Sequence, residues 1–107
     1  MRFLVQDNEI KLGEGKLILY FYASQMPYHP MMLDLIEKTE EKHKGIVFVA
    51  IDAEYFEGLS RRFEIKSVPT IIALNNGKVD NRIVALPTLS QFADICRVGD
   101  TNEKGTQ

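Results

Sequence analysis

The sequence predicts an α/β fold in which a central mixed β-sheet is flanked by helices on both faces. Two apolar runs, residues 17–22 and 46–51, are continuous enough to be strands covered on both faces, and an amphipathic segment of helical length separates them. A strand, a helix and a second strand in this order favour a parallel pair with a helical crossover. Further along, Asn76-Gly77 between two apolar runs is a typical hairpin turn, which adds an antiparallel pair.

Length and composition are those of a single domain, and they exclude several classes of function. The chain has 107 residues, of which 45% are hydrophobic and 26% charged, and its net charge is −2. It lacks the clustered Lys and Arg of a nucleic-acid-binding protein, and no apolar run approaches the about 20 residues of a membrane span. We expect one domain over residues 1–99 and a polar tail over residues 100–107. We also expect a cytoplasmic monomer, because one cysteine excludes an internal disulfide and the N-terminus turns acidic too soon for a signal peptide.

Two short segments precede the first buried strand. Residues 3–5 have the pattern of a short strand. Residues 7–15 fit either a brief helix or a loop, and Gly13 and Gly15 close the segment. The buried strand over residues 17–22 follows, and its apolar and aromatic side chains require cover on both faces of the sheet.

The helix after this strand is the longest one expected. It should begin between Pro27 and Pro30, because proline suits a first helical turn, where its missing N–H is no loss. It should run to about Lys44, and Gly45 should stop it. Its buried side chains recur at spacings of three and four residues. They are Met32, Leu35, Ile36 and Thr39.

The second half of the chain is expected to hold a strand, a short helix, a hairpin and a last helix. After the strand over residues 46–51, one side of the short helix carries Phe56, Leu59 and Phe63. Residues 70–74 and 79–84 are the two arms of the hairpin. The segment Thr88-Leu89-Ser90-Gln91 has the spacing of a capping box and opens the last helix. The buried side of that helix is expected to consist of Leu89, Phe92, Ala93 and Cys96.

Four local motifs occur in a fixed order along these elements. Phe21-Tyr22-Ala23 ends the first buried strand, and Met26-Pro27-Tyr28-His29 follows it. Val68-Pro69-Thr70 comes before the hairpin, and Asn76-Gly77 forms its turn. In order and spacing, these motifs resemble the thioredoxin family over roughly residues 3–98, with its Phe-Trp-Ala strand end, its Cys-x-x-Cys motif, its cis-proline loop and its Asn-Gly turn. The resemblance implies a thioredoxin-like fold in which the Val68–Pro69 bond is cis.

The sequence departs from the family wherever the family carries its chemistry. Met26 and His29 stand where the resemblance places two cysteines, so both active-site cysteines are replaced. The family's buried proton-handling aspartate falls at Tyr20, and its partnering lysine falls at Ala50. Thiol–disulfide exchange needs a thiolate, and the only thiol, Cys96, is expected to lie in the core. We therefore expect no catalytic residue for disulfide chemistry.

The centre of the replaced motif resembles glutaredoxins more than thioredoxins, because Pro27-Tyr28 matches the inner pair of Cys-Pro-Tyr-Cys. The segment after Pro69 nevertheless lacks the glycine pair with which glutaredoxins hold glutathione. We expect no cofactor and no metal ion, since Met32 belongs to the buried side of its helix and is not a free copper ligand. His29 is expected at the surface, where the helix N-terminus favours a neutral imidazole.

The leading hypothesis is a redox-inactive module that binds a protein or an extended peptide with the surface that carries the chemistry in the family. There, the cis-proline loop holds extended substrate chain, and the backbone next to Val68 can pair with a strand without any sulfur. Tyr28 is the expected anchor, because an exposed aromatic offers a large contact area. The residues expected to form this surface are Gln25, Met26, Tyr28, His29, Val68, Pro69 and Thr70.

Two other functions stay open from the sequence. The chain could be an enzyme with non-thiol chemistry that conjugates glutathione through Ser24 or Tyr28, although glutathione transferases use a second, helical domain beyond such a unit. It could also be an inactive relic of a thiol–disulfide oxidoreductase. Binding to immobilised glutathione separates the enzyme from the binding module, and a pull-down of partners under non-reducing conditions separates the module from the relic.

Overall fold

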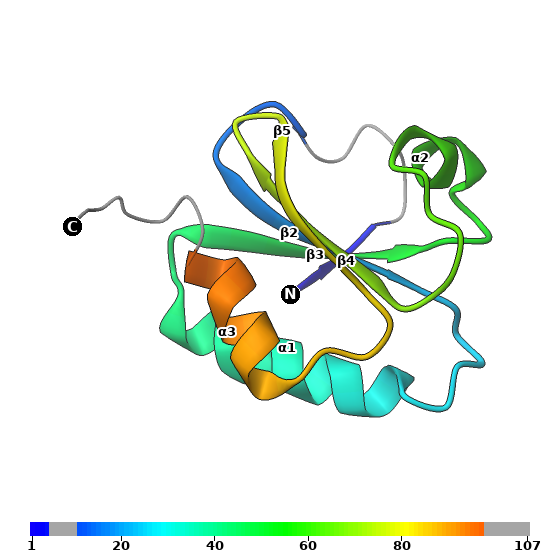
Figure 1. Cartoon of the computed structure of the whole chain (residues 1–107), viewed down its shortest axis with the longest axis horizontal. Helices are drawn as coiled ribbons and strands as arrows, with labels where there is room; N and C mark the ends of the chain where they lie inside the picture. The colour runs from blue at the N-terminus through cyan, green and yellow to red at the C-terminus, as the bar shows by residue number, and fades with distance from the viewer. Residues whose placement is uncertain (5–10, 98–107) are drawn as a thin grey trace.

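The computed structural model describes residues 1–4 and 11–97, which form one five-stranded sheet with helices on both faces (Figure 1). The strands are β1 (Arg2–Phe3), β2 (Lys16–Tyr22), β3 (Ile46–Asp52), β4 (Thr70–Asn75) and β5 (Lys78–Val84). The helices are α1 (His29–Lys42), α2 (Glu57–Arg62) and α3 (Leu89–Arg97). The predicted mixed sheet flanked by helices is confirmed. None of the helices in the described part is long and apolar enough to cross a bilayer.

The strands lie in the order β1-β3-β2-β4-β5, so β2 is the central strand and β3 and β4 are its neighbours. The pair of β2 and β3, joined through α1, is parallel as expected from the crossover. The pair of β4 and β5 is the predicted antiparallel hairpin. Its turn residues Asn76 and Gly77 have φ values of 51° and 87°, the left-handed conformation that this kind of tight turn requires.

The core has one layer on each face of the sheet, because side chains alternate along each strand. From β2, Ile18 and Tyr20 point to the layer that α1 and α3 cover. Leu19 and Phe21 point to the opposite layer, where Phe56 and Phe63 at the two ends of α2 close the core. Tyr20 is thus a core residue. Its hydroxyl needs a hydrogen-bond partner inside the protein, and that partner belongs to the candidate site.

Several predicted boundaries and faces are corrected by the structure. The first strand begins one residue earlier than predicted and is Arg2–Phe3; the Leu4 N–H still donates to Ala50 O at 2.9 Å, and residue 5 of the predicted strand lies outside the described residues. The helix α1 ends at Lys42, two residues before the predicted end. Residues 7–10 of the ambiguous segment 7–15 lie outside the described residues, and so does the predicted tail over residues 100–107. On α1, Met32 and Ile36 are buried, whereas Leu35 and Thr39 are only half-buried.

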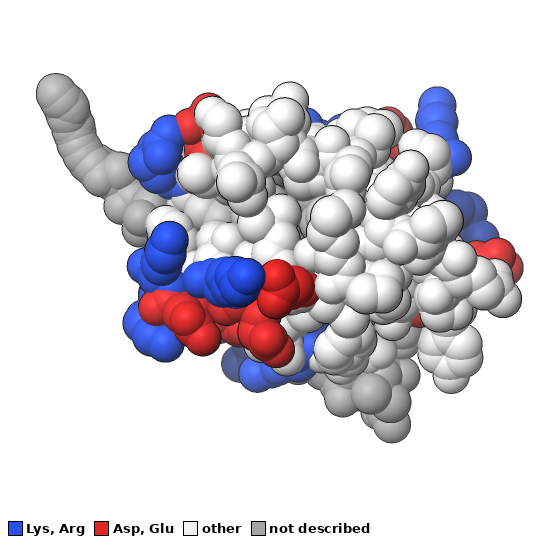
Figure 2. All heavy atoms as spheres, turned by 90° about the horizontal axis from the view of Figure 1, so that it is seen from below, with Lys and Arg blue, Asp and Glu red and all other residues white. Residues whose placement is uncertain are grey.

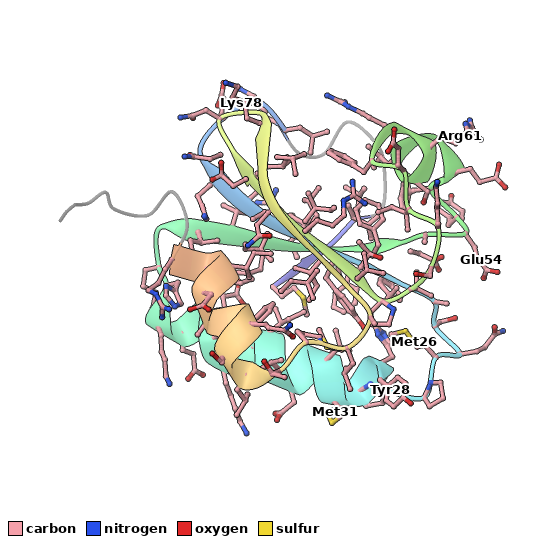
Figure 3. The ribbon with its side chains drawn as sticks, in the orientation of Figure 1. Met26, Tyr28, Met31, Glu54, Arg61 and Lys78 are labelled. Carbon is pink, nitrogen blue, oxygen red and sulfur yellow. The ribbon has the colours of Figure 1, made fainter. Side chains whose placement is uncertain are left out.

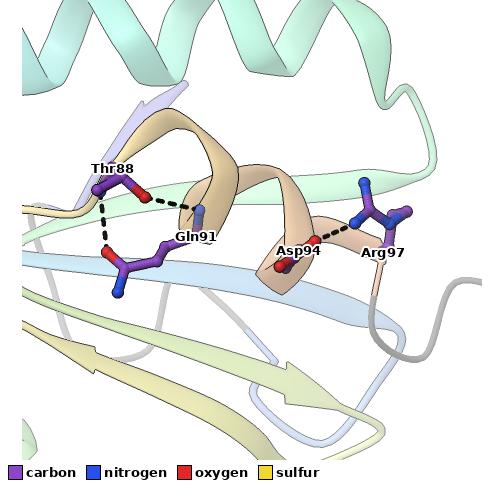
Figure 4. Close-up of polar contacts among 4 residues, drawn as sticks. All are labelled: Thr88, Gln91, Asp94 and Arg97. Carbon is purple, nitrogen blue, oxygen red and sulfur yellow. Dashed lines mark hydrogen bonds and ion pairs between the residues drawn. The ribbon is translucent and has the colours of Figure 1, made fainter.

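The last helix begins with the predicted capping box. The Gln91 N–H donates to Thr88 Oγ1 at 3.0 Å, and the Thr88 N–H donates to Gln91 Oε1 at 2.9 Å (Figure 4). The predicted buried side is confirmed at Phe92 and Cys96, but Leu89 is 74% exposed and Ala93 is only half-buried, while Ile95 is fully buried. Leu89 is the first residue of α3 and faces a surface pocket with Leu86. The spacing of apolar residues places Leu89 on the apolar side of α3, but it does not show that the core ends before this residue.

Candidate functional site

The replaced motif forms the turn that leads from β2 into α1. The Met26 N–H donates to Ala23 O at 3.0 Å, and the His29 N–H donates to Met26 O at 3.1 Å. The helix then begins at His29, with a proline in its first turn as predicted. Figure 3 shows Met26, Tyr28 and Met31 close together at this end of α1. The turn therefore presents the motif at the helix N-terminus, where the macrodipole favours neutral or negative groups.

The Val68–Pro69 loop lies at the same end of the sheet as the motif. Phe21 near the end of β2 pairs with Thr70 at the start of β4, so the residues that follow the one and precede the other are neighbours. The Val68–Pro69 peptide bond is cis. The Pro69 carbonyl accepts a hydrogen bond from the Ala85 N–H at 2.9 Å, which ties this loop to the end of β5. Within the described part of the chain, no residue hydrogen-bonds to the backbone of Val68.

The predicted surface residues divide into an exposed group and a buried group. Gln25 and Tyr28 are exposed, and the Tyr28 side chain keeps 47% of its area accessible. Met26, His29 and Val68 are half-buried. The remaining two residues, Pro69 and Thr70, are buried and support the loop from below; the Thr70 hydroxyl donates to Ser67 O at 2.7 Å. We call the five accessible residues the candidate surface: Gln25, Met26, Tyr28, His29 and Val68.

His29 is held by the aromatic side chains of β2, and this corrects the prediction of a simple surface residue. Its Nδ1 lies 2.9 Å from the Tyr20 hydroxyl, and its ring stacks on the ring of Tyr22 with centroids 4.4 Å apart and planes at 13°. Since the buried phenol O–H has no other acceptor among the described residues, we assign it as the donor to Nδ1. The neutral imidazole then carries its proton on Nε2.

Burial sets the protonation of this pair. Burial raises the pKa of Tyr20 well above its ordinary value, and the neighbouring Tyr22 adds to the rise. Burial also lowers the pKa of His29, while the carboxylate of Asp52 opposes part of that shift. At neutral pH, the site therefore holds a neutral phenol and a neutral imidazole. Such a pair can exchange protons with a ligand, but it contains no sulfur that could form a mixed disulfide.

The pKa of His29 is expected to move in opposite directions in two variants. Tyr20→Phe removes the hydrogen-bond donor that favours the neutral ring, so the pKa of His29 should rise toward its ordinary value. Asp52→Asn removes a negative charge that favours the protonated ring, so the pKa of His29 should fall further. NMR titration of the His29 ring protons measures the pKa shift in each variant, and shifts of equal sign would contradict the assignment.

The lowered pKa of His29 also makes stability depend on pH. Because the folded protein has the lower pKa, the unfolded chain binds more protons as pH falls through 6.5, and the free energy of unfolding decreases there.

Three residues of the site were not found from the sequence. Tyr22 stacks on His29, and Asp52, which pairs with Tyr22 across the sheet, accepts the Glu54 N–H at 3.0 Å. Ala85 has a φ of 78° and is exposed, where glycine is the usual residue. These residues lie on three separate segments, so no spacing in the sequence relates them. Only the place of Tyr20, where the resemblance puts a buried acid, pointed toward the pair with His29.

The left-handed backbone of Ala85 is expected to cost stability. A non-glycine residue in this region is strained by about 1 kcal/mol, so Ala85→Gly should stabilise the protein by up to about that amount, less the entropy that glycine adds to the unfolded chain. Ala93→Gly, within α3, is the matched control and should destabilise by about 1 kcal/mol. Urea unfolding monitored by circular dichroism measures both, and equal signs would show that the backbone at residue 85 is unstrained.

Among the described residues, no group of three His, Cys, Asp or Glu side chains could hold a metal ion. What the structure assembles is an α/β unit with a cis-proline loop beside the N-terminus of its first long helix, which is the arrangement of thioredoxin-fold domains. A sequence model of the thioredoxin family matches residues 5–97. The chain therefore belongs to the thioredoxin family.

Sequence relatives and solved structures agree with this assignment. Glutaredoxin 3 of Danio rerio is 30% identical over 82 residues, which are 75% of this chain but 25% of that protein. Thioredoxin-2 of Saccharomyces cerevisiae is 26% identical over 78 residues, 73% of this chain and 75% of its own. Thioredoxin of Plasmodium falciparum superimposes with a TM-score of 0.82 at 14% identity, over 94% of this chain and 98% of its own, which confirms the predicted thioredoxin-like fold. The chain spans about a quarter of the length of the glutaredoxin 3 that it matches.

Proposed function

We propose that this chain is a redox-inactive thioredoxin-fold module that binds a protein or an extended peptide at the candidate surface. The observation that carries the proposal is the hydrogen bond between Tyr20 and His29. A phenol and an imidazole fill the two positions at which the family resemblance places a buried acid and a cysteine. Neither group can attack a disulfide, and the only thiol, Cys96, is fully buried on the inner side of α3.

The binding half of the proposal is supported by the backbone of Val68 and by Tyr28. An extended chain can pair with the free N–H and C=O groups of Val68, in the manner of a strand added to a sheet edge. Tyr28 offers a large, exposed aromatic surface nearby, and such residues often carry most of a binding energy. A cytoplasmic location is part of the proposal, because the sequence holds no second cysteine for an internal disulfide.

The redox half is tested by the reduction of insulin with dithiothreitol. The wild-type chain and Cys96→Ser are expected to precipitate insulin no faster than dithiothreitol alone, because no accessible thiolate exists in either. The double variant Met26→Cys/His29→Cys is the positive control, and it is expected to form an internal disulfide between the restored cysteines. Wild-type reduction above the Cys96→Ser rate would show that Cys96 reacts and would contradict the proposal.

A further inference from the structure

A pocket of about 300 Å³ opens next to the candidate surface, between the first half of α1 and the segment that joins β5 to α3. Its volume lies at the small end of the range for ligand sites, so it has room for one large side chain. Met31 is 55% exposed, and Leu89 is also largely exposed. The apolar side chains that line the pocket are Met31, Met32, Leu35, Leu86, Pro87 and Leu89.

Two short connections place this pocket beside the candidate surface. The Ala85 N–H bonds to the Pro69 carbonyl, and Leu86, which follows Ala85, lines the pocket. On the other side, Met31 is the second residue after His29 and lies beside Tyr28 at the N-terminal end of α1 (Figure 3). The pocket therefore adjoins the Val68 loop on the same face of the protein, and an extended ligand that pairs with the backbone next to Val68 can reach it.

The segments around this face carry no charged side chain, although 26% of the whole chain is charged. Residues 17–33, 67–77 and 83–93 contain no Asp, Glu, Lys or Arg. Figure 2 shows a broad uncharged surface on this side of the molecule, with a cluster of charged side chains at one end and further charged side chains along the edges. At the pocket rim, Asp34 and Lys38 form an ion pair of 3.0 Å with each other. The charged side chains that line the pocket are therefore this one mutual pair, and the rest of the lining is apolar.

We propose that the partner contributes an uncharged extended segment that places one large apolar side chain in the pocket between Met31, Leu86 and Leu89. The inference rests on the proposed function and specifies its partner. A charged side chain would lose its hydration on this face without gaining an opposite charge, and interface cores are depleted of charged residues for this reason. The flexible methionine in the pocket wall adapts to leucine, methionine or phenylalanine as the anchor.

An array of random twelve-residue peptides, probed with the labelled protein, tests this proposal. The peptides that bind are expected to lack charged residues and to share one large apolar residue. Affinity for a selected peptide should change less than twofold between 50 and 500 mM NaCl, because exposed charges make little contribution. Leu89→Asp should weaken binding at least tenfold, and it should fold normally because Leu89 is exposed at a helix N-terminus, where aspartate is favourable.

The matched control is Val79→Asp, a half-exposed position in the hairpin away from the pocket, which should bind as the wild type does. Selection of charged peptides, a strong salt dependence, or wild-type affinity of Leu89→Asp would overturn the inference. If Tyr28→Ala and Val68→Asp still abolish binding in that case, the proposed function stands while the pocket plays no part. If those two variants bind normally, or if no peptide binds, the proposed function fails together with the inference.

Discussion

Phe92→Ala is expected to destabilise the protein by about 3–5 kcal/mol, a large part of the about 5–15 kcal/mol that holds a domain of this size together. The Phe92 side chain is 1% exposed and lies in the core layer with Tyr20, Met32 and Ile36. Its removal leaves a cavity between α3 and the sheet that the rigid strands cannot close. Urea unfolding followed by circular dichroism measures the loss.

Leu89→Ala is the control on the same helix. Because Leu89 is largely exposed, its truncation should change the free energy of unfolding by no more than about 0.5 kcal/mol. The difference in stability between Phe92→Ala and Leu89→Ala also tests which side of α3 faces the core. Comparable losses in the two variants would mean that Leu89 belongs to the core, as the periodicity alone suggests.

Tyr28→Ala is expected to weaken binding of a selected peptide by about 1–2 kcal/mol, which is roughly a five- to thirtyfold rise in Kd. The side chain is exposed in the free protein, so its removal should leave the free energy of unfolding nearly unchanged. Tyr28 is the residue just before α1, near Met31 of the pocket lining (Figure 3), and a ligand that spans the candidate surface and the pocket would bury its ring. Isothermal titration calorimetry gives the change in Kd.

Lys42→Ala is the control for this variant, because Lys42 is exposed in the last turn of the same helix and does not line the pocket. An exposed charge contributes little energy, so binding of an uncharged peptide should not change. Should Lys42→Ala weaken binding as much as Tyr28→Ala does, the contact would lie along the helix and not at its N-terminus.

The fold could be predicted because its main signals are local. The strands β2 and β3 follow from unbroken apolar runs, the hairpin from Asn76-Gly77, and the start of α1 from its prolines. The capping box at Thr88 depends on a spacing of three residues, which the sequence displays directly. Each of these features is determined within one turn or one strand.

The contents of the site could be predicted only in part, because its contacts join distant segments. The position of the motif followed from the resemblance, but the bond from His29 to Tyr20 depends on how α1 packs against β2. The strained backbone of Ala85 has no sequence signal, since alanine seldom adopts a positive φ. The apolar pocket has no local signal either, because the periodicity of α3 predicts a buried Leu89 and nothing in the sequence brings Leu86 beside α1.

The most direct test of the central claim is an NMR titration of the ¹⁵N-labelled wild-type protein with a selected peptide. The account predicts that amide shifts change at residues 25–31, at Val68 and at residues 85–89, while residues 40–44 at the far end of α1 stay unchanged. These changes would locate the ligand on the candidate surface and in the adjoining pocket. Changes confined to residues 40–44 of α1 and its end, with the motif and the Val68 loop unaffected, would contradict the claim that this chain binds its partner where its family carries its chemistry.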